Sequence, residues 1–170
     1  MQQRRLLLVR HAHAAAGPVD AERPLTERGE RDATALGTWL AQAGLVPDRV
    51  LVSPARRAVQ TWERAGGALA PDLQPVVDQR IHDNTVEALL AAVRETPEDV
   101  RTLAVVGHNP SVGALVGVLD DGAGDPVARD GLGAGFPPGG VAVFVLATPF
   151  EALAPGTATL SASHAPGTPG

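Results

Sequence analysis

Short runs of apolar residues alternate along the chain with longer segments in which apolar residues recur every three or four positions. Continuous apolar runs at Leu6–Val9, Val50–Val52 and Leu103–Val106 are typical of strands that are buried on both faces of a sheet. A weaker run at Gln74–Val77 predicts one more short strand. Two runs near the end of the chain, Val141–Ala147 and Thr157–Ser163, predict a hairpin at the edge of the sheet.

Two of the expected helices begin at residues whose side chains can cap a helix. Thr26 precedes a stretch, 33–43, in which apolar residues recur at helical spacing, and Gly44 supplies a stop. Asn84 and Glu87 have the spacing of a capping box and precede another amphipathic stretch. The sequence therefore predicts one helix after the first strand and one before the Leu103–Val106 strand.

Two further helices are introduced by a small polar residue followed by proline, at positions 53–54 and 109–110. Such a pair supplies a cap and a proline in the first helical turn. We expect the first of these helices to run to about Gly66 and the second to cover Ser111–Leu119. Residues 120–140 are rich in Gly, Pro and Asp and predict a long loop. Strands that alternate with helices predict an α/β fold with a mostly parallel sheet and an antiparallel edge.

Composition narrows the classes of protein. A chain of 170 residues is long enough for one domain with a real core, and we expect a single domain over 1–164 with a flexible tail at 165–170. The formal net charge of −5 argues against nucleic acid as the main partner. The absence of Cys excludes disulfides and thiolate chemistry. The N-terminal apolar run is too short for a signal peptide or a membrane span, so we expect a soluble, cytoplasmic protein.

Three of the predicted strands lead into polar residues that suit one anionic ligand. These residues are Arg10 and His11 after the first strand, Ser53 and Arg57 after the second, and His108 after the Leu103–Val106 strand. Ligands of open α/β sheets bind beyond the carboxyl ends of the strands. The planar fork of arginine binds phosphate oxygens in pairs, and helix N-termini favour anions. The sequence therefore predicts a phosphoryl site at this edge.

Two other interpretations of these residues stay open on the residues alone. Paired histidines can bind a metal, but no third His or carboxylate lies at a ligand spacing nearby, and flanking arginines repel a cation. We therefore expect no metal and no cofactor. The histidines can also be hydrogen-bonded core or loop residues, with Arg57 as a solvated surface charge.

Four motifs in this order resemble the histidine phosphatase superfamily, which is also called phosphoglycerate mutase-like. Leu8–Ala12 resembles the Arg-His-Gly signature, and Pro24–Gly29 resembles the Leu-Thr-x-x-Gly element. Ser53–Thr61 resembles the Ser-Pro-x-x-Arg-Ala-x-Gln-Thr element, and Val106–Asn109 resembles the second-histidine element. The resemblance spans about residues 5–146. The short chain, with Ala12 where the signature has Gly, resembles the SixA-type branch, the bacterial phosphohistidine phosphatases.

The resemblance implies a three-layer α/β/α sandwich and a covalent mechanism. His11 would accept the phosphoryl group as a phosphohistidine and pass it to water. Arg10, Arg57 and His108 would bind the phosphoryl oxygens and offset charge in the transition state. The arginine of the family motif directly precedes Ala-x-Gln-Thr, which selects Arg57 over Arg56.

Other candidate residues have two interpretations each. Ser53 and Asn109 are further phosphate ligands or only helix caps. Larger relatives use a Glu as general acid in a motif that is absent here, and Asp83 is the candidate in its place or a simple turn residue. His82 and His13 contact the rim of the site or are exposed loop residues.

The resemblance implies a metal-independent phosphatase that acts on a phosphomonoester or a phosphoramidate. A short chain leaves no room for a large cap over the site, and an open pocket suits a phosphorylated protein more than a small phosphorylated metabolite. The favoured function is that of a SixA-like protein phosphohistidine phosphatase, as a monomer or weak homodimer. The alternatives are a small-molecule phosphatase, a phosphoglycerate mutase-type phosphotransferase, and a module that only binds phosphate or phosphoproteins.

Overall fold

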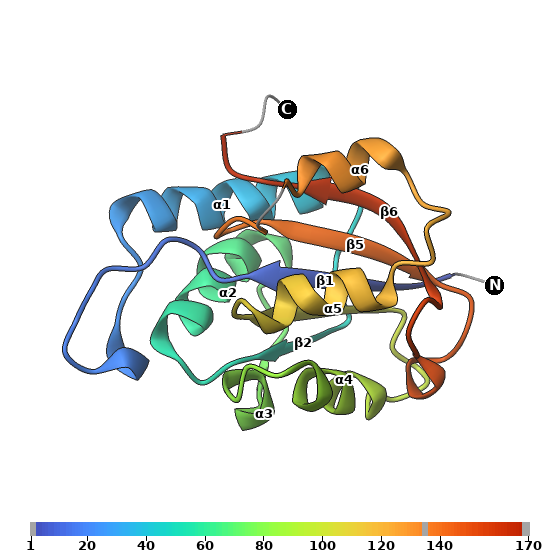
Figure 1. Cartoon of the computed structure of the whole chain (residues 1–170). Coiled ribbons are helices and arrows are strands. Elements are labelled where there is room, and N and C mark those ends of the chain that lie inside the picture. Colours follow the sequence, from blue (N-terminus) through green and yellow to red (C-terminus); the bar gives the residue numbers. More distant parts are fainter. Residues whose placement is uncertain (1–2, 134–135, 168–170) are drawn as a thin grey trace.

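A six-stranded sheet forms the centre of the fold in the computed structural model, which describes residues 3–133 and 136–167 (Figure 1). The strands are β1 (Arg4–Arg10), β2 (Arg49–Val52), β3 (Val76–Val77), β4 (Thr102–Gly107), β5 (Val141–Leu146) and β6 (Ala158–His164). They lie in the order β3-β2-β4-β1-β5-β6. The first four strands are mutually parallel, whereas β5 is antiparallel to both β1 and β6. The predicted mostly parallel sheet with an antiparallel edge is confirmed.

Helices cover both faces of this sheet. The α-helices are α1 (Glu27–Gln42), α2 (Arg56–Leu69), α3 (Gln79–His82), α4 (Val86–Arg94), α5 (Ser111–Leu119) and α6 (Pro126–Gly131). Two short 3-10 helices are η1 (Asp20–Glu22) and η2 (Phe150–Ala152). Helices α1 and α2 pack on one face, and α3, α4 and α5 pack on the other. The predicted three-layer α/β/α sandwich is confirmed. Among the described residues, no helix is long and apolar enough to cross a membrane.

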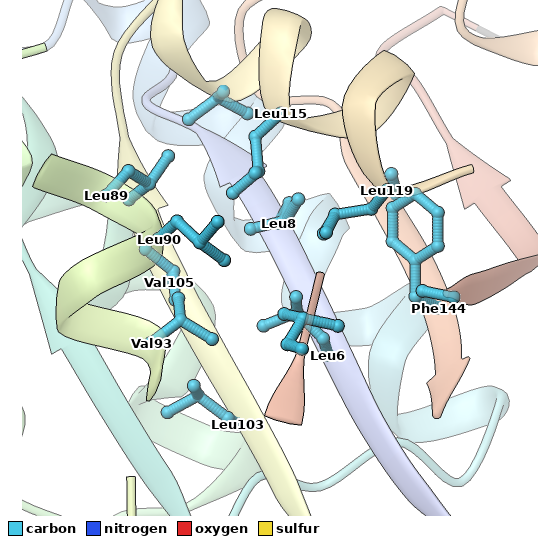
Figure 2. Packing of buried hydrophobic residues seen from close by; sticks show 14 of the residues in the cluster. Leu6, Leu8, Leu89, Leu90, Val93, Leu103, Val105, Leu115, Leu119 and Phe144 are labelled. Carbon is cyan, nitrogen blue, oxygen red and sulfur yellow. The ribbon is translucent and has the colours of Figure 1, made fainter. Parts of the chain in front are cut away.

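Strand β1 lies between the two hydrophobic cores. Leu6 and Leu8 point to the face covered by α4 and α5, where they join a cluster that includes Leu89 and Leu115 (Figure 2). Leu7 points to the opposite face, against α1 and α2. Side chains of a strand alternate between faces, so a strand covered on both sides needs a continuous apolar run. Each fully buried Leu contributes about 1.5–3 kcal/mol to folding, which anchors the residues that follow β1.

The helix after β2 begins later than the sequence predicts. Ser53 does not cap this helix, because its N-cap is Ala55. The helix ends at Leu69, three residues beyond the predicted end at Gly66. The Ser53 hydroxyl accepts a hydrogen bond from the Ala55 N–H at 3.2 Å and contacts the buried ring of His108 at 2.8 Å. The prediction of a cap at Ser53 was wrong because this side chain is directed toward the neighbouring strand end.

The predicted capping box at Asn84 and Glu87 is also wrong. The cap of α4 is Thr85, whose hydroxyl accepts from the Ala88 N–H at 3.1 Å. Asn84 has a φ of 63°, in the left-handed region that Asn tolerates better than most residues. Its amide donates instead to the backbone carbonyl of Asn109 at 2.8 Å. Asn84 therefore joins the segment before α4 to the start of α5.

The later segments differ from prediction in detail. Helix α5 has the predicted bounds, but its N-cap is Pro110. The predicted loop 120–140 contains α6, which Asp125 caps by accepting from the Val127 N–H. Residues 134–135 of this loop and 168–170 of the predicted tail lie outside the described residues. Ala165, the first residue of the predicted tail, is buried. The end of the single domain at 164 stays a prediction.

Candidate active site

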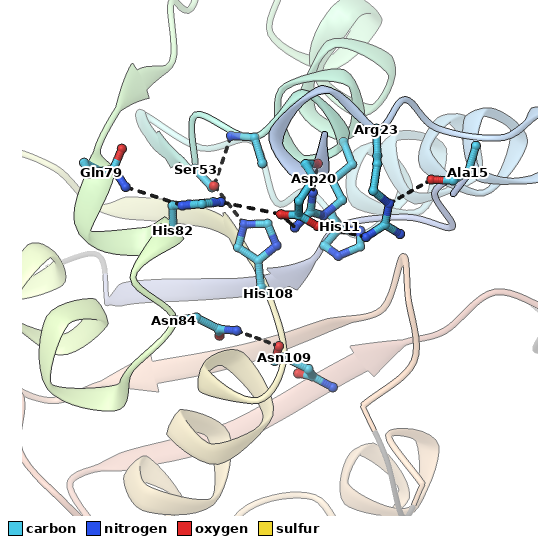
Figure 3. Close-up of polar contacts among 12 residues, drawn as sticks. His11, Ala15, Asp20, Arg23, Ser53, Gln79, His82, Asn84, His108 and Asn109 are labelled. Carbon is cyan, nitrogen blue, oxygen red and sulfur yellow. Dashed lines mark hydrogen bonds and ion pairs between the residues drawn. The ribbon is translucent and has the colours of Figure 1, made fainter. Parts of the chain in front are cut away.

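A polar cavity of about 450 Å³ opens at the carboxyl ends of β1, β2 and β4. Its lining residues are Arg10, His11, Asp20, Arg23, Arg57, His82, Asn84, His108 and Asn109, several of which appear in Figure 3. The fold therefore brings together five of the seven residues that the sequence nominates for catalysis or phosphate binding. Of the two further candidates for the rim, His82 lines the cavity and His13 does not. Ser53 and Asp83 are not among the lining residues.

His11 directly follows β1 and is held in one tautomer. Its Nδ1 atom lies 2.8 Å from the carbonyl oxygen of Ala12. A carbonyl only accepts hydrogen bonds, so the proton of the neutral ring lies on Nδ1 and the lone pair lies on Nε2. Burial lowers the pKa of His11 to about 4. At neutral pH, His11 is therefore an uncharged imidazole with a nucleophilic Nε2.

His108 lies beside His11, with ring centroids 5.1 Å apart and planes inclined by 58°. Only 4% of His108 is exposed, and its Nε2 contacts the Ser53 hydroxyl at 2.8 Å. Burial, together with the nearby His11 ring, lowers the pKa of His108 to about 3. Like His11, this ring is uncharged at neutral pH.

Positive charge in the cavity comes from arginines. Arg57 is only 7% exposed, and its Nη1 and Nη2 donate to the carbonyl and carboxylate oxygens of Asp20 at 2.8 and 3.2 Å. Arg10 donates from Nη1 to the carbonyl of Phe136 at 2.8 Å, and burial lowers its pKa. Arg56 is exposed and does not line the cavity. The position of Arg57 agrees with the register that the motif predicts.

The side chains of Ser53 and Asn109 form hydrogen bonds to other groups of the protein. Ser53 is fully buried beneath His108, outside the cavity lining. Asn109 lines the cavity, but its amide donates to the Phe136 carbonyl at 3.0 Å and accepts from the Gly113 N–H at 3.1 Å. These contacts orient the strand end and the first turn of α5.

The position of Asp83 does not support its prediction as general acid. Asp83 is the exposed C-cap of α3, and its neighbours His82 and Asn84 line the cavity instead. Successive residues on a helix differ in direction by about 100°, so the residue beside a cavity-lining one points elsewhere. The ring of His82 meets that of His108 edge-on, with centroids 5.6 Å apart.

The sequence interpretation missed three residues of the cavity. Asn84 was expected only as a helix cap, and Asp20 and Arg23 were not singled out at all. Asp20 begins η1, and its carboxylate contacts Arg23 at 3.1 Å, Arg57 at 3.2 Å and His82 at 3.9 Å (Figure 3). The hydrogen bond from Arg23, and then that from Arg57, hold the pKa of Asp20 below its usual value. The segment that carries both residues has no periodicity, and its one signal is an Asp and an Arg after the first strand.

The Pro24–Gly29 motif fixes the loop that follows His11. A Cβ atom on Gly29 would lie 2.0 Å from the carbonyl oxygen of His13, so only glycine permits this approach. The Thr26 N–H donates to the same carbonyl at 3.0 Å, and the Thr26 hydroxyl caps α1. The start of α1 therefore packs directly on the loop.

The Gln-Thr pair of the Ser53–Thr61 motif also holds backbone segments near the site in place. Gln60 accepts a hydrogen bond from the Leu25 N–H at 2.8 Å. The Thr61 hydroxyl accepts from the Ala12 N–H at 3.0 Å and donates to the Arg57 carbonyl at 2.7 Å. One buried threonine thus connects the backbone next to His11 with the backbone of Arg57.

Comparison with known proteins agrees with this arrangement. The sequence pattern of the Histidine phosphatase superfamily (branch 1) matches residues 6–89. The phosphohistidine phosphatase SixA of Escherichia coli is 35% identical over 131 residues, which cover 72% of this chain and 78% of that protein. The chain belongs to the histidine phosphatase superfamily.

Solved structures of this superfamily share the whole fold. A structure assigned to SixA of Nakamurella multipartitia superposes with a TM-score of 0.86 at 32% identity, covering 99% of both chains. A structure of the protein histidine phosphatase SixA complexed with tungstate has a TM-score of 0.75 at 28% identity, covering 95% of this chain and 97% of that one. Membership of the superfamily makes the chain a phosphatase with a phosphoglycerate mutase-like fold. Within residues 3–133 and 136–167, no group of three or more His, Asp or Glu side chains is arranged to hold a metal.

Proposed function

We propose that this chain removes phosphate from phosphohistidine side chains of proteins, through a phosphoryl group carried on His11. The observation that carries the proposal is the state of the His11 ring. Its Nδ1 proton is hydrogen-bonded to the Ala12 carbonyl, and the uncharged ring lies in a cavity that three buried or half-buried arginines also line.

In the first step, the Nε2 lone pair of His11 attacks phosphorus, and the bond from phosphorus to the substrate nitrogen breaks with its electron pair staying on that nitrogen. The substrate ring, protonated on its other nitrogen, leaves as neutral imidazole. Arg10 and Arg57 bind the phosphoryl oxygens, whose charge they offset in the transition state. The uncharged ring of His108 lines the same cavity, and the contact of its Nε2 with the Ser53 hydroxyl holds the ring in place. In the second step, water takes the phosphoryl group and the electron pair returns to Nε2, while Nδ1 keeps its proton throughout.

The charge state of the cavity supports a nitrogen-linked phosphate as substrate. An alkoxide leaving group needs a protonated acid, whereas the imidazole of phosphohistidine has a near-neutral pKa and departs more readily. Among the described residues that line the cavity, Asp20 is the one carboxylic acid, and its lowered pKa keeps it ionised at neutral pH. This site therefore lacks a strong general acid.

The open side of the cavity and two similar proteins support a phosphorylated protein as the substrate. The side chain of Asp20 at the mouth is 60% exposed, so this side of the cavity is open to solvent, as access for a phosphorylated protein side chain requires. The similar Escherichia coli protein is a phosphohistidine phosphatase, and the tungstate in a similar structure is a tetrahedral oxyanion like phosphate.

Two peptides of one sequence, carrying phosphohistidine or phosphoserine at the same position, test this substrate class. We expect kcat/KM to be on the order of 10²-fold or more higher for the phosphohistidine peptide, the factor that a missing general acid commonly costs. Phosphate release is measured for both peptides with the same enzyme preparation. A phosphoserine peptide that is hydrolysed equally fast or faster would contradict the proposal and favour a general phosphomonoesterase.

A further inference from the structure

We propose that Asp20 is the catalytic base that activates water for hydrolysis of phosphorylated His11. The inference rests on the proposed function, because it assigns a residue to the second step of that reaction. Asp20 lies outside the four motifs that carry the family resemblance, on the short helix η1 between the first two of them. Its carboxylate nevertheless lines the cavity.

The position of Asp20 at the mouth of the cavity is the first argument. In phosphoryl transfer, the entering and leaving groups lie roughly in line on opposite sides of phosphorus. His11 and the buried His108 form the inner part of the cavity, at the ends of β1 and β4. Water that attacks phospho-His11 must therefore approach from the open side. The Asp20 side chain, 60% exposed, lies on that side.

The contacts of the carboxylate are the second argument. Asp20 binds Arg57, the proposed phosphate ligand, at 3.2 Å, so it lies next to the phosphoryl position. Arg23 contacts the other carboxylate oxygen at 3.1 Å and helps to keep the group ionised. An ionised carboxylate beside the phosphate and open to solvent can accept a proton from water. Among the described lining residues, no other carboxylate has this position.

The proposed step balances in atoms and charge. The Asp20 carboxylate takes one proton from water while the water oxygen forms a bond to phosphorus. The bond between phosphorus and His11 Nε2 breaks, and its electron pair returns to Nε2. His11 leaves as a neutral imidazole because Nδ1 has kept its proton, which is hydrogen-bonded to the Ala12 carbonyl. The proton on Asp20 then passes to solvent, to which the side chain is exposed.

Asp20→Asn is the decisive variant, because the amide oxygen still accepts from Arg57 but cannot take a proton at neutral pH. A phosphohistidine peptide labelled with ³²P is mixed with enzyme, and labelled protein and free phosphate are followed with time. We expect Asp20→Asn to form phosphoenzyme at a rate near that of the wild type and to release phosphate on the order of 10²-fold more slowly. Glu22→Gln, an exposed residue of η1 outside this cavity, is the matched control and should behave as wild type.

A role of Asp20 in merely holding Arg57 predicts a different pattern. Both the formation and the hydrolysis of phosphoenzyme would then fall together in Asp20→Asn, which would overturn the inference. Asp20→Gly adds a positive test, because formate can enter the vacated space and replace the missing carboxylate. We expect formate to restore the hydrolysis of phosphoenzyme in Asp20→Gly and to leave the wild type unaffected.

His82 is the competing base, since it lies 3.9 Å from Asp20 at the same mouth. If phosphoenzyme persisted in His82→Gln but was hydrolysed at the wild-type rate in Asp20→Asn, His82 would be the group that takes the proton from water. That result would overturn the inference. Absence of any phosphoenzyme in the wild type would instead refute the proposed function itself. The labelling experiment thus separates the failure of one from the failure of the other.

Discussion

Arg57 holds Asp20 with two nitrogens, at 2.8 Å from Nη1 to the backbone carbonyl and 3.2 Å from Nη2 to the carboxylate. These two contacts fix the guanidinium at the wall of the cavity. The neighbouring Arg56 is exposed and does not line this cavity. Two arginines that are adjacent in sequence therefore have different surroundings.

The first prediction concerns this pair of arginines. Arg57→Ala should lower kcat/KM by about 10²-fold or more, equivalent to about 3 kcal/mol or more of transition-state stabilisation. Arg56→Ala is the matched control and should change mainly the KM for bulky or charged substrates. Steady-state kinetics on a phosphohistidine peptide measures both. Equal losses would mean that both arginines bind the phosphate, and a larger loss at Arg56 would refute the assignment of Arg57.

The pH dependence of activity should reflect the buried state of His11. The attacking ring must be neutral, and burial lowers its pKa to about 4 from an ordinary value of about 6.5. We therefore expect kcat/KM to stay level as the pH falls from 7 to 5 and to decline only near pH 4. The measurement is a pH profile of kcat/KM, which reports the free enzyme. A midpoint near 6.5 would show that His11 titrates as a solvated histidine.

Ser53 should matter for stability as well as for rate, because it is buried against the ring of His108. Ser53→Ala removes the partner of His108 Nε2 and leaves a buried polar atom unpaired, which costs about 1–3 kcal/mol. Urea denaturation measures the free energy of unfolding. Thr34→Ala, at an exposed position of α1, is the control and should change that free energy by less than about 0.5 kcal/mol. An equally small change for Ser53→Ala would refute the proposed role of this hydroxyl.

Chelators should leave the activity unchanged. In the proposed transfer through His11, arginines rather than a metal offset the phosphate charge, and superfamily membership makes the enzyme metal-independent. Assay after prolonged treatment with EDTA measures this, and tungstate should inhibit the same preparation by occupying the phosphate position. Loss of activity with EDTA and its recovery with zinc would indicate a metal-dependent hydrolase instead.

The elements that the sequence predicts well are those fixed by burial or by a motif. The run Leu6–Val9 predicts a central strand because a strand covered on both faces needs apolar residues at every position. The resemblance of Ser53–Thr61 to the family motif predicts Arg57 rather than Arg56 for the site, and Arg57 is the one of the two that lines the cavity.

The residues that the sequence does not predict lie on or next to very short helices within loop segments. Asp20 enters the cavity because the loop after His11 is fixed by contacts between backbone atoms, such as the approach of Gly29 to the His13 carbonyl. No local pattern encodes such contacts. Asp83 illustrates the same limit, because its direction depends on the end of a helix of four residues, α3, that the sequence does not predict.

The central claim is that a phosphoryl group is carried on His11. The most direct test is to mix enzyme with a ³²P-phosphohistidine peptide, quench in alkali within milliseconds, and map the labelled residue after proteolysis. The account predicts label on His11 in the wild type and no label or turnover in His11→Asn, with melting temperatures of the two proteins within about 2–4 °C, a shift of roughly 1 kcal/mol. His13→Asn, a change at an exposed histidine outside the cavity, should label normally. Label on another residue, or turnover that persists in His11→Asn, would contradict the account.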